Sequence, residues 1–213
     1  MKQPSQPLYR HYDIIIAVFV ALLLISNIAA TKLIVVGPLI MDGGAILFPL
    51  TYIIGDILAE VYGLKRAKRA IFTAFGISIL AALTFLAVQY LPGAPAYTNQ
   101  EAFEAVLGFV PQIVIASLAA FLCGQFINAY VLTKVKEKWG SKHLWVRLLS
   151  STVAGQLVDT TIFCTIAFFG TLTGLDFLNY VLVGVIYKIA MEVILLPVTY
   201  RVIAFIKRHE AVE

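Results

Sequence analysis

Residues 48–63 read FPLTYIIGDILAEVYG, an apolar segment that is long enough to enter a membrane and yet carries two carboxylates. Asp56 and Glu60 lie four positions apart, so a helix presents both of them on one face. A charge at the centre of a bilayer costs about 2.5–3.5 kcal/mol on insertion scales. The segment therefore predicts a membrane-spanning helix whose polar face points away from lipid, toward the interior of the protein.

The composition of the whole chain is typical of a membrane protein. Of its 213 residues, 61% are hydrophobic and 13% are charged, whereas soluble domains have about 45–50% and about 25%. A transmembrane helix needs about 20 apolar residues, so a chain of this length accommodates about six with short connections. We predict an all-α polytopic membrane protein, a single integral membrane domain over residues 1–213 with six transmembrane helices in one bundle. The predicted spans are roughly 13–31, 45–63, 70–91, 110–133, 149–170 and 177–206.

The basic residues predict the orientation of these spans. In the six-span arrangement, 14 of the 16 Lys and Arg residues fall on one side: before the first span, after the second, after the fourth and at the end of the chain. The positive-inside rule places that side in the cytoplasm, together with both termini. Since the basic residues lie between apolar spans, the net charge of +4 does not indicate nucleic-acid binding. The first apolar run lacks a cleavage site and is expected to be retained as a helix.

Two connections on the opposite side are informative. MDGGA at residues 41–45 is expected to be short and flexible. The longest connection covers residues 91–111, where Thr98 and Glu101 have the spacing of a capping box before a short interfacial helix. We interpret this connection as a plain connector, and a lid over a pocket is the alternative.

Polar residues inside the apolar spans are the candidates for function, because lipid makes each of them costly. They occur as pairs three or four positions apart, which places each pair on one helical face. The pairs are Asp56/Glu60, Gln125/Asn128, Gln156/Asp159 and Lys188/Glu192, and Asn27 lies near the outer end of the first span. Such faces are expected to converge around a shared cavity. With four carboxylates and one ammonium, a fully ionised interior has a net charge of −3, which favours uptake of protons, a cationic ligand, or both.

Two of these pairs also have a purely structural interpretation. Lys188 and Glu192 can neutralise each other within one helix, and Gln125 and Asn128 can join helices through contacts worth about 0.6 kcal/mol each. The motifs GQFIN (124–128) and GQLVD (155–159) repeat one pattern on consecutive spans. Their glycines would let these two helices approach closely.

The individual carboxylates differ in how strongly they indicate function. Glu60 lies near the cytoplasmic end of its span, where it can reach water or pair with Lys65. Asp159 is the strongest candidate, because it lies about ten residues inside its span and has no cation in its own helix. Asp56 is intermediate between the two.

The sequence contains no enzyme signature. A Gly-rich phosphate loop, HExxH, GxSxG and a His/Cys metal cluster are all absent. We therefore expect no enzyme activity, no metal and no cofactor. Cys123 and Cys164 fall inside spans and are interpreted as small buried hydrophobic residues without a disulfide.

Five segments together resemble one family of bacterial inner-membrane proteins, the queuosine-precursor transporters. They are SNIAATKL (26–33), FPLTYIIGDILAEVYG (48–63), GQFINAYVLTKVK (124–136), LWVRLLSSTVAGQLVDTTIF (144–163) and YKIAMEVILLPVTY (187–200). The resemblance touches every predicted span except the third. It implies a multi-pass transporter that imports a 7-deazaguanine base for tRNA modification: the 7-cyano precursor, the 7-aminomethyl precursor or queuine.

The chemistry of such a base agrees with the polar pairs. A guanine-like edge offers two donors, which one carboxylate of Asp56 or Asp159 can accept together, and Glu192 can attract a cationic aminomethyl group. The ring carbonyl needs a donor, and the flat ring favours an aromatic slot. Candidate donors are Gln125, Asn128 and Gln156, and candidate rings are Phe48, Tyr52, Phe126, Phe163 and Tyr187. The predicted substrate-binding set is Asn27, Tyr52, Asp56, Glu60, Gln125, Asn128, Gln156, Asp159, Lys188 and Glu192.

Two other functions are compatible with the sequence. One is a substrate-capture subunit of an ATP-driven vitamin or nucleobase importer, which co-purification with an ATPase partner would indicate. The other, less favoured, is a membrane-embedded hydrolase that uses Asp56 and Asp159, although no nucleophile or metal site accompanies them. The expected partners are a small nucleobase-like substrate and the lipid bilayer, with no nucleic acid, and a homo-oligomer is left open.

Overall fold

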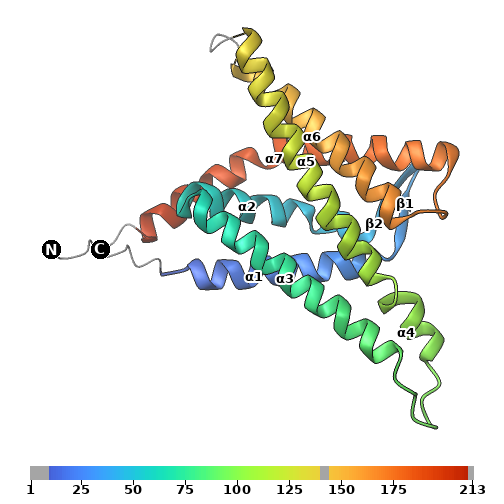
Figure 1. The fold of residues 1–213 in the computed structure, drawn as a ribbon. Coiled ribbons are helices and arrows are strands. Elements are labelled where there is room, and N and C mark those ends of the chain that lie inside the picture. Colours follow the sequence, from blue (N-terminus) through green and yellow to red (C-terminus); the bar gives the residue numbers. More distant parts are fainter. Residues whose placement is uncertain (1–9, 140–143, 211–213) are drawn as a thin grey trace.

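The computed structural model describes residues 10–139 and 144–210, which fold mainly into helices (Figure 1). In chain order the elements are α1 (Tyr12–Ala29), β1 (Leu33–Val36), β2 (Leu39–Asp42), the 3-10 helix η1 (Gly43–Ile46), α2 (Phe48–Tyr62), α3 (Leu64–Gln89), α4 (Gln100–Leu107), α5 (Val110–Trp139), α6 (Leu144–Ala167) and α7 (Gly174–Glu210). Each of the six predicted spans corresponds to one helix. The start of α1 and the end of α7 meet at one end of the bundle, here called the terminal end. The β1–β2 hairpin lies at the opposite end, here called the hairpin end.

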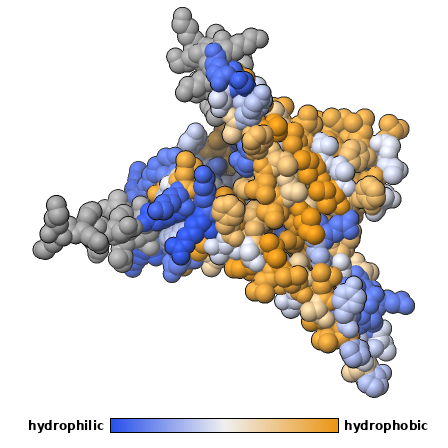
Figure 2. Space-filling model, viewed as in Figure 1, coloured by the Kyte–Doolittle hydropathy of each residue, from blue (hydrophilic) through white to orange (hydrophobic). Residues whose placement is uncertain are grey.

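Several helices are suited to crossing a membrane. Within the described residues, four helical segments are long and apolar enough: α1, α3, the segment Gln100–Val135 and α7. With 15 residues, α2 rises only about 23 Å, against a hydrocarbon core of about 30 Å. Polar side chains interrupt the apolar sequence of α6. Figure 2 shows a broad apolar surface over the middle of the molecule and polar residues toward its extremities. The chain is therefore multi-pass, and the count of six spans stays a prediction.

The connection between α1 and α2 is ordered, so the prediction that MDGGA is flexible is wrong. β1 and β2 form an antiparallel hairpin with Gly37 at φ 61° in its turn, which adds a small sheet to the all-α prediction. The Asp42 carboxylate then accepts a hydrogen bond from the Gly44 N–H at 2.8 Å and caps η1. The segment packs directly on α1, because a Cβ on Gly43 would lie 2.5 Å from the Ala29 carbonyl oxygen.

The connection at residues 91–111 contains the predicted short helix, α4. Its N-cap is Asn99 and no side chain caps it, so the predicted capping box of Thr98 and Glu101 is wrong. The Gln100 side-chain amide instead donates to the Gln89 carbonyl at the end of α3, at 3.1 Å. None of residues 91–111 lines the central cavity described below. These contacts favour a connector over a lid.

α5 and α6 form a long helical hairpin whose backbones touch (Figure 1). A Cβ on Gly124 would lie 2.8 Å from the Asp159 Cβ, and a Cβ on Gly155 would lie 2.9 Å from the Asn128 Cβ. Such short distances leave no room for a larger side chain, which is the close approach that the repeated motifs predict.

An apolar cluster closes the hairpin end of the bundle. It includes buried Cys164, Phe168 and Tyr180, and Leu33 and Ile40 of the β-hairpin pack against it. The cluster therefore joins α6 and α7 to the β1–β2 hairpin. Cys164 is buried as predicted, whereas Cys123 is exposed, contrary to the prediction.

Candidate functional site

A cavity of about 500 Å³ lies in the middle of the bundle, between α1, α2, α3, α5, α6 and α7. Small-molecule sites have volumes of about 300–1,000 Å³, so this cavity can hold a ligand of modest size. Its polar lining consists of Ser26, Asn27, Asp42, Thr51, Tyr52, Asp56, Ser117, Gln125, Asn128, Thr152, Gln156, Asp159, Lys188 and Glu192. Its aromatic lining consists of Phe19, Phe48, Tyr52, Phe75, Phe121 and Phe163. This mixture suits a flat ring with a polar edge.

The structure gathers nine of the ten predicted substrate-binding residues around this cavity. They are Asn27, Tyr52, Asp56, Gln125, Asn128, Gln156, Asp159, Lys188 and Glu192. Glu60 is the exception. Convergence of the polar faces is thus observed, and contact of these residues with a ligand stays a prediction.

A buried ion pair joins two helices in the cavity wall. The Lys188 ammonium on α7 donates to the Asp159 carboxylate on α6 at 2.5 Å, and their side chains are 9% and 24% exposed. The ammonium also lies 5.1 Å from the centroid of the Phe48 ring, a cation–π arrangement. The partner of Lys188 is therefore Asp159, and the interpretation that Lys188 pairs with Glu192 is wrong.

Aromatic side chains lie beside this ion pair. The Gln156 amide donates to the Tyr52 hydroxyl at 3.4 Å, and the Tyr52 and Phe48 rings are 6.3 Å apart between centroids. These residues form one wall of the cavity. Of the other predicted rings, Tyr187 lines only a smaller pocket, and Phe126 is 69% exposed and lines neither.

Four polar residues of the cavity have no protein partner. Within the described residues, Asp56, Glu192, Gln125 and Asn128 form no hydrogen bond and no ion pair, and all four line the cavity. Asp56 and Glu192 are close enough to interact electrostatically. Two like charges near each other in a membrane interior favour a bound cation or a proton. The cavity thus offers two acceptors and two amides to a ligand.

Two residues near the hairpin end complete the polar wall. Asn27 is 5% exposed, and its side-chain nitrogen has no partner among the described residues. Asp42, which is not among the predicted site residues, is 4% exposed and accepts a hydrogen bond from the Tyr180 hydroxyl at 2.6 Å. Burial raises the pKa of the Asp42 carboxyl, although its hydrogen bonds and the nearby Lys188 ammonium act in the opposite direction. The only sequence signal for Asp42 was an aspartate directly before two glycines, typical of a local turn.

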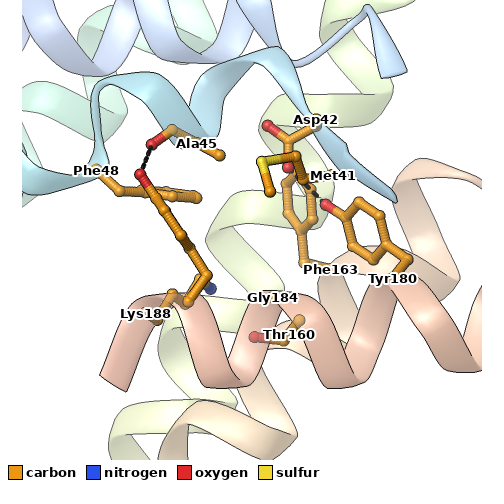
Figure 3. A pocket seen from close by; sticks show the side chains of 10 residues that line it. Met41, Asp42, Ala45, Phe48, Thr160, Phe163, Tyr180, Gly184 and Lys188 are labelled. Carbon is orange, nitrogen blue, oxygen red and sulfur yellow. Dashed lines mark hydrogen bonds between the residues drawn. The ribbon is translucent and has the colours of Figure 1, made fainter. Parts of the chain in front are cut away.

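A second, smaller pocket of about 20 Å³ lies between η1 and α7 (Figure 3). It is lined by Asp42, Phe48, Thr160, Lys188 and other residues from both sides. The hydroxyl of Thr160 has no hydrogen-bond partner among the residues that the structure describes. About one water molecule fits in such a space. The pocket therefore lies between the Asp42 carboxylate and the Lys188–Asp159 ion pair.

Glu60 lies outside the cavity, at the terminal end of α2. Its carboxylate accepts a hydrogen bond from the Lys207 ammonium at 2.7 Å, and both side chains are largely exposed. The prediction that Lys65 pairs with Glu60 is therefore wrong, because the partner is Lys207. Helical spacing alone cannot separate Asp56 from Glu60, because one turn along α2 moves a side chain from the cavity to the surface.

We expect Glu60→Gln to leave ligand binding and uptake within about twofold of the unchanged protein, because exposed ion pairs contribute little. Asp56→Asn, one turn away on the same helix, is the matched variant that should lose most of both. Parallel uptake measurements in cells, normalised to membrane expression, make the comparison. An equal loss in the two variants would contradict the division between cavity and surface.

Comparison with known proteins supports a transporter. A family model described as "Putative vitamin uptake transporter" matches residues 42–202. A "Probable queuosine precursor transporter" of Bacillus subtilis (strain 168) is 31% identical over 178 residues, which cover 82% of this chain and 77% of that relative. A "Queuosine precursor transporter" of Escherichia coli (strain K12) is 26% identical over 125 residues, 59% of this chain and 54% of that relative. No solved structure matches the chain significantly.

The names of these relatives indicate that the protein is a transporter. They are named as transporters rather than as enzymes, and a third similar protein, from Haemophilus influenzae, has the same name as the Bacillus relative. Together with the long apolar helices, they support a multi-pass protein of the bacterial inner membrane. The chain spans about half the length of the Escherichia and Haemophilus relatives and most of the Bacillus one. Because the family model covers most of the chain, this membrane transporter belongs to the family described as "Putative vitamin uptake transporter".

Proposed function

We propose that this chain imports a queuosine precursor, a 7-deazaguanine base, through the central cavity. The observation that carries the proposal is the convergence of unpartnered carboxylates and amides on one cavity with an aromatic wall. The names of the similar proteins supply the substrate class.

The geometry favours particular roles for the cavity residues. One oxygen of Asp159 is engaged by Lys188. Asp56 has no hydrogen bond or ion pair within the described part of the chain and can accept both donors of the guanine-like edge. The unpartnered amides of Gln125 and Asn128 can donate to the ring carbonyl. The wall of Phe48 and Tyr52 offers a surface for stacking.

The charge of the cavity favours a cationic substrate. Its lining holds four carboxylates, Asp42, Asp56, Asp159 and Glu192, and one ammonium, Lys188. If all were ionised, the net charge would be −3, the value expected from the sequence although Asp42 takes the place of Glu60. A 7-aminomethyl base carries a positive charge that Glu192 can attract, and a 7-cyano base does not. The preferred ligand is therefore the 7-aminomethyl precursor.

The transporter has six spans in one integral membrane domain, with both termini in the cytoplasm. This topology is supported by the basic residues, since Arg10, Lys65, Arg69 and Lys207 all lie at the terminal end of α1, α2, α3 and α7. The tight α5–α6 crossing brings the polar faces of these two helices together in the cavity. The hairpin end then faces outward.

Equilibrium binding of purified protein to a ligand panel tests the substrate. The panel contains the 7-aminomethyl and 7-cyano bases, queuine, guanine and two vitamins. We expect the 7-aminomethyl base to bind with the lowest Kd and Asp56→Asn to raise that Kd about 10- to 100-fold, the usual effect of losing a hydrogen bond to a charged group. Binding of a vitamin but of no 7-deazaguanine would contradict the proposal. Uptake into liposomes containing this protein alone would exclude a need for an ATPase partner.

A further inference from the structure

We propose that residues 33–46, comprising β1, β2 and η1, form the outer gate of the cavity and are latched to α7 by side chains. The inference extends the proposed function, because a gate has meaning only in a transporter. It concerns the conformational cycle and not the choice of ligand.

The gate segment separates the cavity from the hairpin end of the bundle. Asp42 lines the cavity and is 4% exposed. On the other side of the segment, Leu33 and Ile40 pack against the apolar cluster that contains buried Cys164 and Phe168. The segment thus lies between the cavity and the apolar cluster, and in this proposal it moves to let a solute pass.

Side chains of α7 hold the gate at three successive points. Asn179 accepts a hydrogen bond from the Ile40 N–H at 3.0 Å and donates to the Pro38 carbonyl at 2.9 Å. Tyr180 donates to the Asp42 carboxylate at 2.6 Å (Figure 3). Tyr187 donates to the Ala45 carbonyl at 3.0 Å. Tyr180 and Tyr187 lie seven positions apart and so on one face of α7, and Asn179 directly precedes Tyr180.

The opposite edge of the gate packs closely on the backbone at the end of α1. A Cβ on Gly43 would lie 2.5 Å from the Ala29 carbonyl oxygen, and the Gly43 N–H donates to the carbonyl of Lys32, just after α1, at 2.8 Å. The Ser26 side chain adds one hydrogen bond, to the Gly44 carbonyl at 3.3 Å. A Cβ on Gly44 would lie 2.8 Å from the Ser26 carbonyl oxygen. Close backbone packing resists separation, whereas side-chain hydrogen bonds can break one at a time. The α1 edge is therefore the hinge, and the α7 edge is the latch.

The latch is mechanically connected to the cavity. Lys188, whose ammonium pairs with Asp159, lies on α7 one residue after Tyr187. Asp42 also interacts electrostatically with Lys188 across the small pocket. A shift of α7 that follows ligand binding would thus move the ion pair and the latch together.

The native Cys164 provides a reporter for opening, because it is 0% exposed within the apolar cluster against which Leu33 and Ile40 of the gate pack. We replace exposed Cys123 by Ser and add a charged, membrane-impermeant methanethiosulfonate to right-side-out vesicles without any ligand. We expect slow labelling of Cys164 in this parent and labelling about tenfold faster or more in Tyr180→Phe, which removes one hydrogen bond to a charged group. Asn179→Ala should accelerate labelling in the same direction. Tyr200→Phe is the matched control, since Tyr200 lies on α7 with 66% exposure, far from the gate in sequence.

The outcomes of this experiment test the gate independently of the substrate assignment. Equal labelling rates in the parent, Tyr180→Phe and Asn179→Ala would overturn the latch, and acceleration only in inside-out vesicles would overturn its outer position. Equal acceleration by Tyr200→Phe would attribute the effect to general loosening and would also overturn the latch. Thermal unfolding of each variant identifies a misfolded sample. If Tyr180→Phe does not fold, the labelling rate of Asn179→Ala tests the latch in its place. Since no ligand is present, a wrong substrate assignment leaves this result unchanged.

Discussion

Asp159→Asn is expected to abolish uptake and to lower the free energy of unfolding by about 3–5 kcal/mol. The substitution leaves the Lys188 ammonium, which is 7% exposed as a whole residue, without its counter-charge. An unpaired buried charge is far more costly than a buried pair. The Asp159→Asn substitution also removes a carboxylate from the cavity wall. Cellular uptake and denaturant unfolding in mixed micelles measure the two effects.

The double variant Asp159→Asn/Lys188→Met separates stability from function. Removing both charges should restore most of the lost stability, because apolar replacement of a buried ion pair is often neutral or stabilising. Uptake should stay abolished, since the double variant restores neither charge to the cavity. Full activity of Asp159→Asn, or no recovery of stability in the double variant, would contradict the assigned role of the ion pair.

The polar spacing of the sequence was sufficient to predict the shared cavity. Pairs such as Gln125/Asn128 and Gln156/Asp159 lie on single helical faces, and the expense of polar groups in lipid forces such faces together. The glycines of GQFIN and GQLVD likewise predicted the close α5–α6 crossing. These predictions succeed because each depends on helical periodicity and on the bilayer alone.

Contacts between residues of different helices could not be predicted from the sequence. Lys188 has an acidic neighbour one turn away in Glu192, yet it pairs with Asp159 on another helix. The choice depends on the rotation of α6 and α7 about their axes, which no local pattern determines. Glu60 shares the face of Asp56 but lies one turn nearer the terminal end, where Lys207 reaches it.

The hairpin was missed although the sequence carries its signals. LIVVGPLIMD at residues 33–42 has two short apolar runs around a Gly-Pro turn, a pattern that indicates a β-hairpin. Residues 41–45 are instead predicted as a flexible connection, outside the apolar spans. Asp42 is therefore not among the predicted polar residues of the spans, although it is one of the most buried polar residues that the structure describes.

Gly124→Ala is expected to destabilise the protein by about 1–3 kcal/mol, the usual range for overpacking, and to reduce uptake strongly. The new Cβ would lie 2.8 Å from the Asp159 Cβ and 3.1 Å from the Gly155 carbonyl oxygen. Relief requires α5 and α6 to separate, because the obstructing atoms belong to the helix backbone or are attached directly to it. Separation would displace Asp159 from Lys188, so that a single methyl group disturbs the ion pair as well as the crossing.

Gly76→Ala is the matched control for this substitution. Gly76 lies within α3, is exposed, and would have no heavy atom within 4 Å of an added Cβ. In a helix interior, alanine is favoured over glycine by about 1 kcal/mol, so this variant should be as stable as the unchanged protein or more stable. Unfolding in mixed micelles and uptake in cells compare the two. If both variants shift stability in the same direction, the crossing does not depend on glycine, and the α5–α6 contact would have to be looser than the distances between Gly124, Gly155 and Asp159 imply.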